Sequence, residues 1–189
     1  MRVVLFFIIF IFVGCSHNVQ RVDSKALQLT TIHWGSEDLN EMAEVMVTSV
    51  LKDDYLTTPS KKVLAFLKIK NSTYDHIDTK SITDSIKTGL IKSARANIID
   101  IKQRDTLNTE LEYQKEKQKY YKKIKKIGRQ LGVDAFFFGE ISAIYQKNST
   151  IKNMGFTFVL NLVDVQSAQL VWSETMNIQK LYKKSFIGW

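Results

Sequence analysis

The chain contains a single cysteine, Cys15, which stands directly after an apolar run from Val3 to Val13 and one glycine, Gly14. One cysteine excludes an internal disulfide framework and a four-cysteine zinc site. A hydrophobic core must therefore hold the 189 residues together, and 44% apolar with 24% charged residues is the balance of a globular domain. The length predicts one domain, or one domain with appended segments.

The N-terminal apolar run is too short to cross a bilayer, because eleven helical residues rise about 16 Å against a hydrocarbon core of about 30 Å. Arg2 before the run and the small residue after it are typical of a secretory signal peptide. Phe12-Val13-Gly14-Cys15 resembles the lipobox of bacterial lipoproteins, with Phe12 where that pattern prefers leucine. The resemblance implies a signal peptide over residues 1–14, cleavage between Gly14 and Cys15, and lipidation of Cys15; the alternative is an ordinary apolar cysteine.

Acyl chains on Cys15 would fix the mature chain to a membrane, because each buried CH₂ contributes about 0.8 kcal/mol and two or three chains hold where one is marginal. Ser16, in place of aspartate, resembles the signal that sorts lipoproteins to the outer membrane of diderm bacteria. We therefore expect an outer-membrane lipoprotein that faces the periplasm. Residues 15–33 are predicted to form a lipidated tether, which reaches about 24 Å as a flexible coil.

Helices and strands are predicted from the periodicity of apolar residues. A first helix starts at Ser36 as N-cap, a second carries Ile82, Ile86 and Leu90, and a third lies within 105–131. The predicted strands are Val63–Leu67, Ile98–Ile101, Asp134–Ile144, Phe156–Val163 and Leu170–Ser173, with a polar loop from Asn71 to Asp78. This order predicts an α/β (α+β) single domain, with a mixed sheet of about four to five strands flanked by three to four helices.

Positive charge is concentrated on the third predicted helix. Residues 115–129 hold seven lysines and one arginine against one glutamate, an excess equal to the net charge left after Arg2 is cleaved off. The predicted buried stripe of this helix is Tyr120, Ile124, Ile127 and Leu131. Its lysine face is either a solvated surface or a docking surface for an acidic protein or an anionic cell-wall glycan. No nucleic acid partner is expected for an exported lipoprotein.

Catalytic patterns are missing from the sequence. His17, His33 and His76 are the only histidines, and they form no His-x-x-x-His pair for zinc. Neither a Gly-x-Ser-x-Gly elbow nor a P-loop occurs. His76 is interpreted as a loop or helix-entry residue that makes a local hydrogen bond. We predict no enzyme, no catalytic residue, no metal, and no cofactor beyond the covalent lipid on Cys15.

Several stretches are similar to one known family: His33–Leu39, Lys68–Thr73, His76–Thr79, Ile127–Ala135, Phe158–Val165 and Leu170–Ser173. Together they resemble the penicillin-binding-protein activator LpoB family over residues 33 to about 180. The resemblance implies a periplasmic domain over residues 34–180 that is similar to the N-terminal domain of TolB. A basic C-terminal tail, residues 181–189, follows it.

The same resemblance implies a lipoprotein that binds and activates a bifunctional peptidoglycan synthase, a class A penicillin-binding protein. The alternative function is a structural lipoprotein subunit of another envelope assembly, such as a secretion or flagellar complex, and the short tether favours it. A periplasmic enzyme or small-molecule binder is a third reading.

The candidate partner-binding residues are Lys122, Lys123 and Phe138. In Phe136-Phe137-Phe138, the first and third side chains share one face of a strand, and Phe137 takes the other. An aromatic side chain flanked by cations is a common interface hot spot, whereas the simpler interpretation is a core phenylalanine beside solvated lysines.

Four further residues carry structural predictions. Trp34 is expected to pin the tether to the domain, and Trp172 to lie at the edge of the core. Ala94 and Ala168 stand where the family tends to have glycine, so both are predicted at positive φ, where alanine costs roughly 1 kcal/mol.

Overall fold

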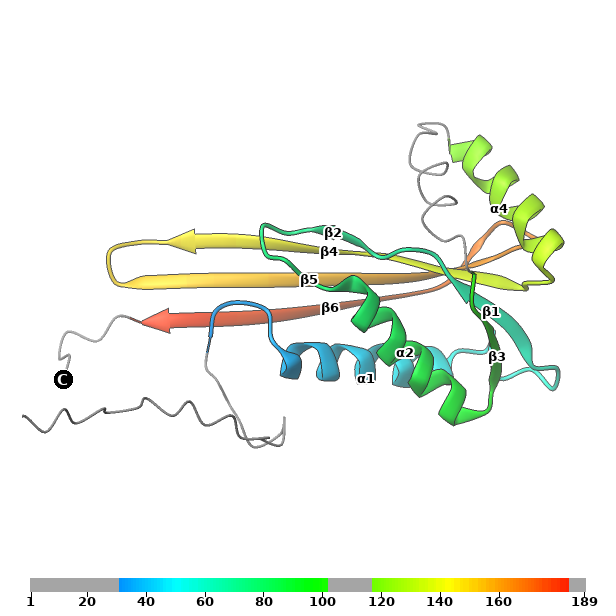
Figure 1. Ribbon diagram of the computed structural model, residues 1–189, viewed down its shortest axis with the longest axis horizontal. Coiled ribbons are helices and arrows are strands. Elements are labelled where there is room, and N and C mark those ends of the chain that lie inside the picture. Colours follow the sequence, from blue (N-terminus) through cyan, green and yellow to red (C-terminus); the bar gives the residue numbers. More distant parts are fainter. Residues whose placement is uncertain (1–30, 102–116, 184–189) are drawn as a thin grey trace, which may run out of the picture.

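Six strands form one mixed sheet in the computed structural model, which describes residues 31–101 and 117–183 (Figure 1). The strands are β1 (Lys62–Phe66), β2 (Lys70–Ser72), β3 (Ala96–Ile99), β4 (Ala135–Lys147), β5 (Ile151–Asp164) and β6 (Leu170–Lys183). Within the described ranges the helices are α1 (Ser36–Lys52), α2 (Thr79–Ser93) and α4 (Lys117–Leu131). The predicted α+β domain with a mixed sheet is thereby confirmed.

The sheet order is β3-β1-β4-β5-β6, with β2 also paired to β4. β3, β1 and β4 are parallel, whereas β4, β5 and β6 form an antiparallel meander. β1 and β2 follow each other along one edge of β4, because β1 lies opposite residues 135–137 and β2 opposite residues 140–142. β2 is the strand beyond the predicted count, and it occupies the start of the predicted polar loop.

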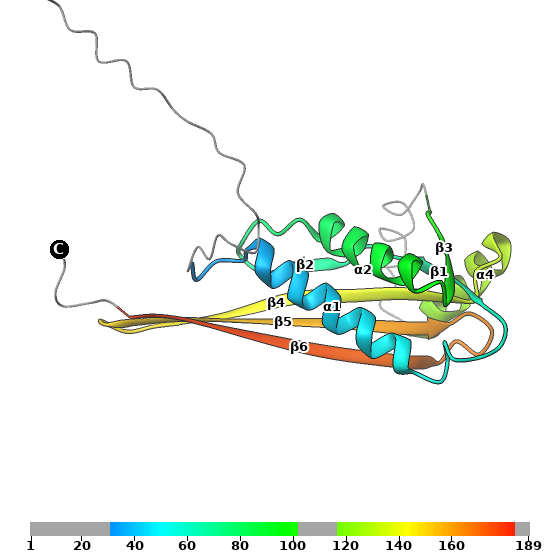
Figure 2. The same cartoon turned by 90° about the horizontal axis from the view of Figure 1, so that it is seen from below.

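Helices α1 and α2 cover one face of the sheet, which we call the helix-pair face (Figure 2). They contribute the buried side chains Met42, Met46, Val50, Ile82, Ile86 and Leu90. From the sheet, Phe137 stacks on Phe66 with ring centroids 4.5 Å apart and meets Trp172 edge-on at 6.0 Å. Trp172, which is predicted at the edge of the core, is one of its buried members.

Helix α4 packs on the opposite face, which we call the α4 face, through a smaller cluster. Its buried members are Ala65, Leu67, Ile101, Ile124, Val133, Phe136, Val163 and Val165. The predicted stripe of α4 is partly wrong: Ile124 is buried and Ile127 half-buried, but Leu131 is exposed. The cause is Gly128, where an added Cβ would lie 2.4 Å from Val165 Cγ2, so the closest approach to the sheet falls at Gly128. The side chain of Tyr120 lies outside the described residues.

The antiparallel meander is longer than predicted. β4 continues to Lys147 and β6 to Lys183, so the three strands run past the start of α1 and leave the helices behind (Figures 1 and 2). Side chains of these extensions point alternately to the two faces of the sheet, but neither face carries an unbroken row of large apolar residues. Most of the side chains are exposed. In β6, Met176 and Ile178 still pack against the core of the helix-pair face. Beyond them, the ends of the strands are held mainly by backbone pairing with β5.

Two alanines have the positive φ angles that are predicted from the glycines the family tends to have at those positions. Ala94 ends α2 at φ 54° and Ala168 lies in the β5–β6 turn at φ 61°, which confirms both positive-φ predictions. The start of α1 differs by one residue, since Gly35 is the N-cap and Ser36 is the first helical residue. Asp38 fixes this start, because its carboxylate accepts the backbone N–H of Gly35 at 2.7 Å.

Candidate interaction surfaces

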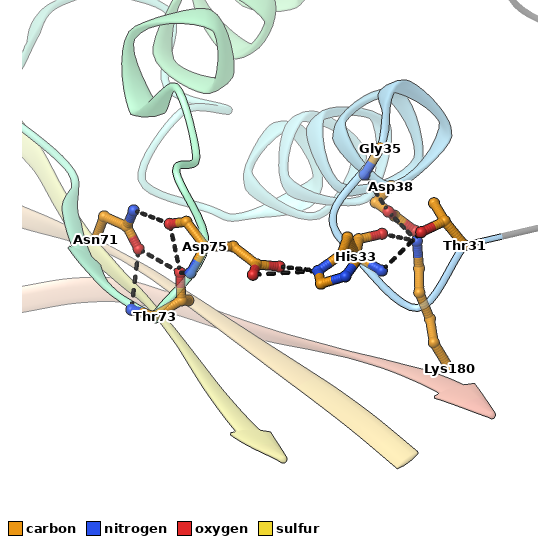
Figure 3. A network of polar contacts seen from close by, with 8 residues as sticks. All are labelled: Thr31, His33, Gly35, Asp38, Asn71, Thr73, Asp75 and Lys180. Atoms are coloured by element: carbon orange, nitrogen blue, oxygen red, sulfur yellow. Dashed lines mark hydrogen bonds and ion pairs between the residues drawn. The ribbon is translucent and has the colours of Figure 1, made fainter. Parts of the chain in front are cut away.

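The segment that leads into α1 is bound to the domain by a polar network, which we call the tether clasp (Figure 3). It consists of Thr31, His33, Gly35, Asp38, Asp75 and Lys180. Lys180, on β6, donates from Nζ to the His33 carbonyl at 2.7 Å and to Asp38 Oδ2 at 2.5 Å. The Asp38 side chain is 9% exposed and that of Lys180 18%, so this ion pair is largely shielded from water.

A second contact in the clasp joins the same segment to the loop after β2. His33 Nδ1 lies 3.2 Å from Asp75 Oδ1 (Figure 3). The loop is shaped by Asn71, whose amide donates to the Asp75 carbonyl at 2.9 Å and whose Oδ1 accepts the Thr73 backbone N–H at 3.0 Å. His33 is therefore held from both sides, by β6 through its carbonyl and by the loop through its ring.

Trp34 supplies the apolar part of the attachment. Its ring meets Phe156 of β5 edge-on at a centroid distance of 5.5 Å, and Ile32 packs against the same core. This contact agrees with the interpretation of Trp34 as the residue that pins the tether to the domain.

The predicted partner patch is only partly visible. Phe136 and Phe138 share the α4 face and Phe137 points to the helix-pair face, as predicted. Phe138 is half-buried against the cluster under α4, and Lys122 is exposed on α4. The side chain of Lys123, and Gly14 and Cys15 in full, lie outside the described residues. Partner binding by these residues stays a prediction.

Tyr55 and Asp164 are two ionisable residues with shifted pKa values that are joined by a hydrogen bond. Burial raises the pKa of Tyr55, and so does its hydrogen bond to Asp164 Oδ2 at 2.7 Å. Burial alone would raise the pKa of Asp164, but hydrogen bonds from the Ser167 backbone and from Tyr55 outweigh it and lower that pKa. At neutral pH the tyrosine is thus protonated and the aspartate ionised, which suits a fixed hydrogen bond and not proton transfer.

A hollow of about 500 Å³ lies at the carboxyl ends of β1 and β3. Its floor is apolar, with Ile69, Ile77 and Ile101 buried. On its rim, Asp78 caps α2 by accepting the Lys80 backbone N–H at 2.9 Å. His76 lies exposed on the same rim, two residues before this N-cap, as predicted for a residue at a helix entry. These contacts serve the start of α2.

The described residues define a class of protein: a single α+β domain whose N-terminal segment is fastened to its central sheet. Within ranges 31–101 and 117–183, no group of three or more His, Cys, Asp or Glu side chains is placed to hold a metal ion. No helix of this part of the chain has both the length and the hydropathy for a membrane span.

The family follows from comparison with known proteins. The family described as peptidoglycan-synthase activator LpoB matches residues 38–178, and the chain belongs to this family. LpoB proteins are activators of peptidoglycan synthases, so the family is a regulatory and not a catalytic one. Comparison with curated protein sequences gives no match.

Solved structures of the family share the fold. The LpoB C-terminal domain from Escherichia coli matches with a TM-score of 0.52 at 18% identity, over 75% of this chain and 98% of that domain. The corresponding domain from Salmonella enterica matches with a TM-score of 0.51 at 17% identity, over the same shares. The NMR structure of E. coli LpoB matches with a TM-score of 0.51 at 18% identity, over 90% of this chain and 78% of that one.

Sequence reasoning missed the tether clasp. Asp38 and Lys180 are 142 residues apart, and His33 and Asp75 are 42 apart, so no local pattern connects them. One signal was present: β6 keeps a period-two alternation from Trp172 to Tyr182, which could have extended the predicted strand and placed Lys180 on the face of Trp172.

Proposed function

We propose that this chain is lipidated on Cys15, is held in the outer membrane with its domain in the periplasm, and binds and activates a class A penicillin-binding protein. The family match over residues 38–178 carries the proposal, because it covers nearly the whole described domain. The lipobox-like sequence before Cys15 supports the anchor.

The proposed mechanism is differential binding. An activator that performs no chemistry can act only by binding the active state of the synthase more tightly than the inactive state. A rigid domain suits this task, and the shielded Asp38–Lys180 pair fixes the N-terminal segment to the sheet on which such a contact would form.

The contact surface that we propose for the synthase is the exposed lysine face of α4 with Phe138 beside it. Lys122 and Lys126 are exposed, and Phe138 is accessible enough to become more buried in a complex. An aromatic side chain with neighbouring cations fits an acidic partner surface.

The test is capture and activation by the chain from Ser16 to Trp189, made without signal peptide or lipid. It should retain a class A synthase from envelope extract and raise the rate of glycan polymerisation by the purified synthase. Lys122→Glu should weaken both effects, whereas Lys92→Glu, the same reversal at an exposed site on α2, should not. Recovery of a ring or pore protein in place of a synthase would contradict the proposal and support a structural role.

The anchor is tested separately. Wild-type chain should incorporate labelled palmitate in cells, and Cys15→Ala should not. Labelling of the Cys15→Ala variant would show that the lipid is attached elsewhere.

A further inference from the structure

The free end of the β4–β5–β6 meander carries a group of exposed apolar side chains. We call this end the sheet tip and define it as residues 144–152 and 181–183. Ile144 is 70% exposed, Leu181 56%, Tyr182 49% and Tyr145 43%. Side chains of this size are usually buried, so four of them at one end of a sheet mark a contact surface.

The sheet tip is also basic. Lys147, Lys152 and Lys183 are exposed there, and Lys152 Nζ lies 5.6 Å from the centre of the Tyr182 ring. The sequence contains no Asp or Glu from Ile141 to Leu162, nor from Thr175 to Lys183. Lysines with aromatic and aliphatic neighbours, and without carboxylates, fit an anionic surface.

The exposed apolar side chains lie on both faces of the tip. Ile144 and Leu181 lie on the α4 face, because their cross-strand neighbours Gly155 and Asn153 alternate with the buried residues of β5. Tyr145 and Tyr182 lie on the helix-pair face, in register with Met154 and Lys152. A protein partner would bury one face, whereas a tip with apolar groups on both faces fits a surface that it enters end-on.

The first described residues, Thr31 to His33, lie near this tip. Lys180, which holds the His33 carbonyl, stands directly before the tip residues of β6. Helix α4 lies at the other end of the sheet (Figures 1 and 2). A chain anchored at Cys15 would therefore present the tip, and not α4, to the membrane that holds the anchor.

We propose that the sheet tip docks on the anionic lipid headgroups of the membrane to which the chain is anchored. The location of that membrane rests on the lipidation part of the proposed function. Tyrosine rings and the alkyl stems of lysine occupy the headgroup region while their polar ends stay in water. A lysine near an anionic leaflet gains about 1 kcal/mol, which is about fivefold in affinity.

Because the chain would already be anchored to the membrane, a weak affinity of the sheet tip for lipid headgroups would be enough for docking. If residues 15–33 form the expected tether, with a reach of about 24 Å, the tip stays within reach of the bilayer. Docking then becomes an intramolecular step at an effective concentration of about millimolar. The docked state would hold the domain at its own membrane and leave α4 pointing away from it.

Vesicle binding by the unlipidated chain from Ser16 to Trp189 tests the proposal. We expect co-sedimentation with vesicles of 30% phosphatidylglycerol in phosphatidylcholine, weaker binding at higher salt, and little binding to pure phosphatidylcholine. Lys147→Gln with Lys152→Gln should reduce the affinity by about 25-fold. The control pair, Lys122→Gln with Lys126→Gln on α4, removes the same charge and should reduce it by less than about threefold.

A second measurement does not depend on removing side chains. The chain from Ser16 has no cysteine, so Leu181→Cys can carry a polarity-sensitive dye, with Lys122→Cys as its control. Dye at 181 should shift to the blue on anionic vesicles, and dye at 122 should not.

Equal losses for the two lysine pairs, or a blue shift only at 122, would overturn the proposal. It would also be overturned if the tip variants kept their vesicle affinity and lost capture of the synthase, which would make the tip a protein contact. Because no lipid is attached in these assays, failure of tip docking and failure of lipidation or synthase activation are distinguished.

Discussion

The two faces of the sheet are covered to very different extents. On the helix-pair face, α1 and α2 bury a continuous core that includes Phe66, Phe137 and Trp172. On the α4 face the apolar cluster is confined to the end of the sheet where β1, β4 and β5 meet α4. Farther along that face, β5 and β6 carry polar pairs, such as Thr157 donating to Asn177 Oδ1 at 2.8 Å and Ser173 donating to Asn161 Oδ1 at 2.8 Å.

This difference assigns stability mainly to one face of the sheet and the groups available for contact mainly to the other. The helix-pair face supplies most of the buried apolar area, which drives folding. The α4 face carries exposed lysines and the half-buried Phe138, and the sheet tip carries exposed lysines and tyrosines. These are the groups that a partner or a surface can bind.

The largest expected effect compares neighbouring residues on the two faces. Phe137→Ala should lower the free energy of unfolding by about 3–5 kcal/mol, because the ring is fully buried against Phe66 and Trp172. Phe138→Ala should cost only about 1 kcal/mol, because that ring is half-buried. Urea denaturation of both variants measures the difference, and equal losses would show that the α4 face is as much a core as the other.

The next effect concerns the edge of the helix-pair face. Asp38→Ala should cost about 2–3 kcal/mol, because it leaves the shielded ammonium of Lys180 without its carboxylate and frees the Gly35 N–H. Adding Lys180→Met should recover part of that loss, since no charge is then left unpaired. Thermal unfolding of the single and double variants checks this, and a double variant weaker than Asp38→Ala would contradict it.

Elements with a periodic pattern of apolar residues along the chain could be predicted from the sequence. Elements that depend on pairing with a distant segment could not. The apolar spacing of α2 and the alternation of β5 are local, and both were predicted. So were Ala94 and Ala168 at positive φ, through the family's glycines at those turns. β2 was missed because its residues, Lys70 to Ser72, are all exposed and polar, so no apolar pattern marks them. They pair with β4 through the backbone and through Glu140, which contacts Lys70 and Ser72.

The same distinction between local patterns and long-range contacts applies to the candidate surfaces. Lys122 and Phe138 could be proposed from charge density and strand alternation. The tether clasp could not, because Asp38 and Lys180 meet only after the sheet has formed, and neither position is unusual in its own segment. The position of Leu131 was wrong because periodicity alone does not show that Gly128 is the point of closest approach to the sheet.

A smaller effect tests how tightly α4 is packed. Gly128→Ala would place a methyl group 2.4 Å from Val165 Cγ2 and 3.1 Å from Phe136 Cε2. Overpacking of this kind costs about 1–3 kcal/mol, and the better helix propensity of alanine returns about 1 kcal/mol, so we expect a net loss of about 1 kcal/mol. Val165→Ala in the same chain should relieve the clash. An unchanged melting temperature for Gly128→Ala alone would mean that α4 sits loosely on its face.

The smallest expected effect is a gain in stability, and it should be similar at the two alanines with positive φ, Ala168 and Ala94. Ala168→Gly, in the β5–β6 turn, relieves a positive-φ strain of about 1–2 kcal/mol. The greater conformational freedom of glycine in the unfolded chain offsets about 0.5–1 kcal/mol of this, so the net stabilisation is about 0.5–1 kcal/mol. The melting temperature should rise by about 2–3 °C. Ala94→Gly, at the end of α2, should give a similar rise, because backbone strain is local and independent of how well the sheet is covered nearby. A rise at one alanine and a fall at the other would show that packing around the turn, and not its φ angle, sets the sign.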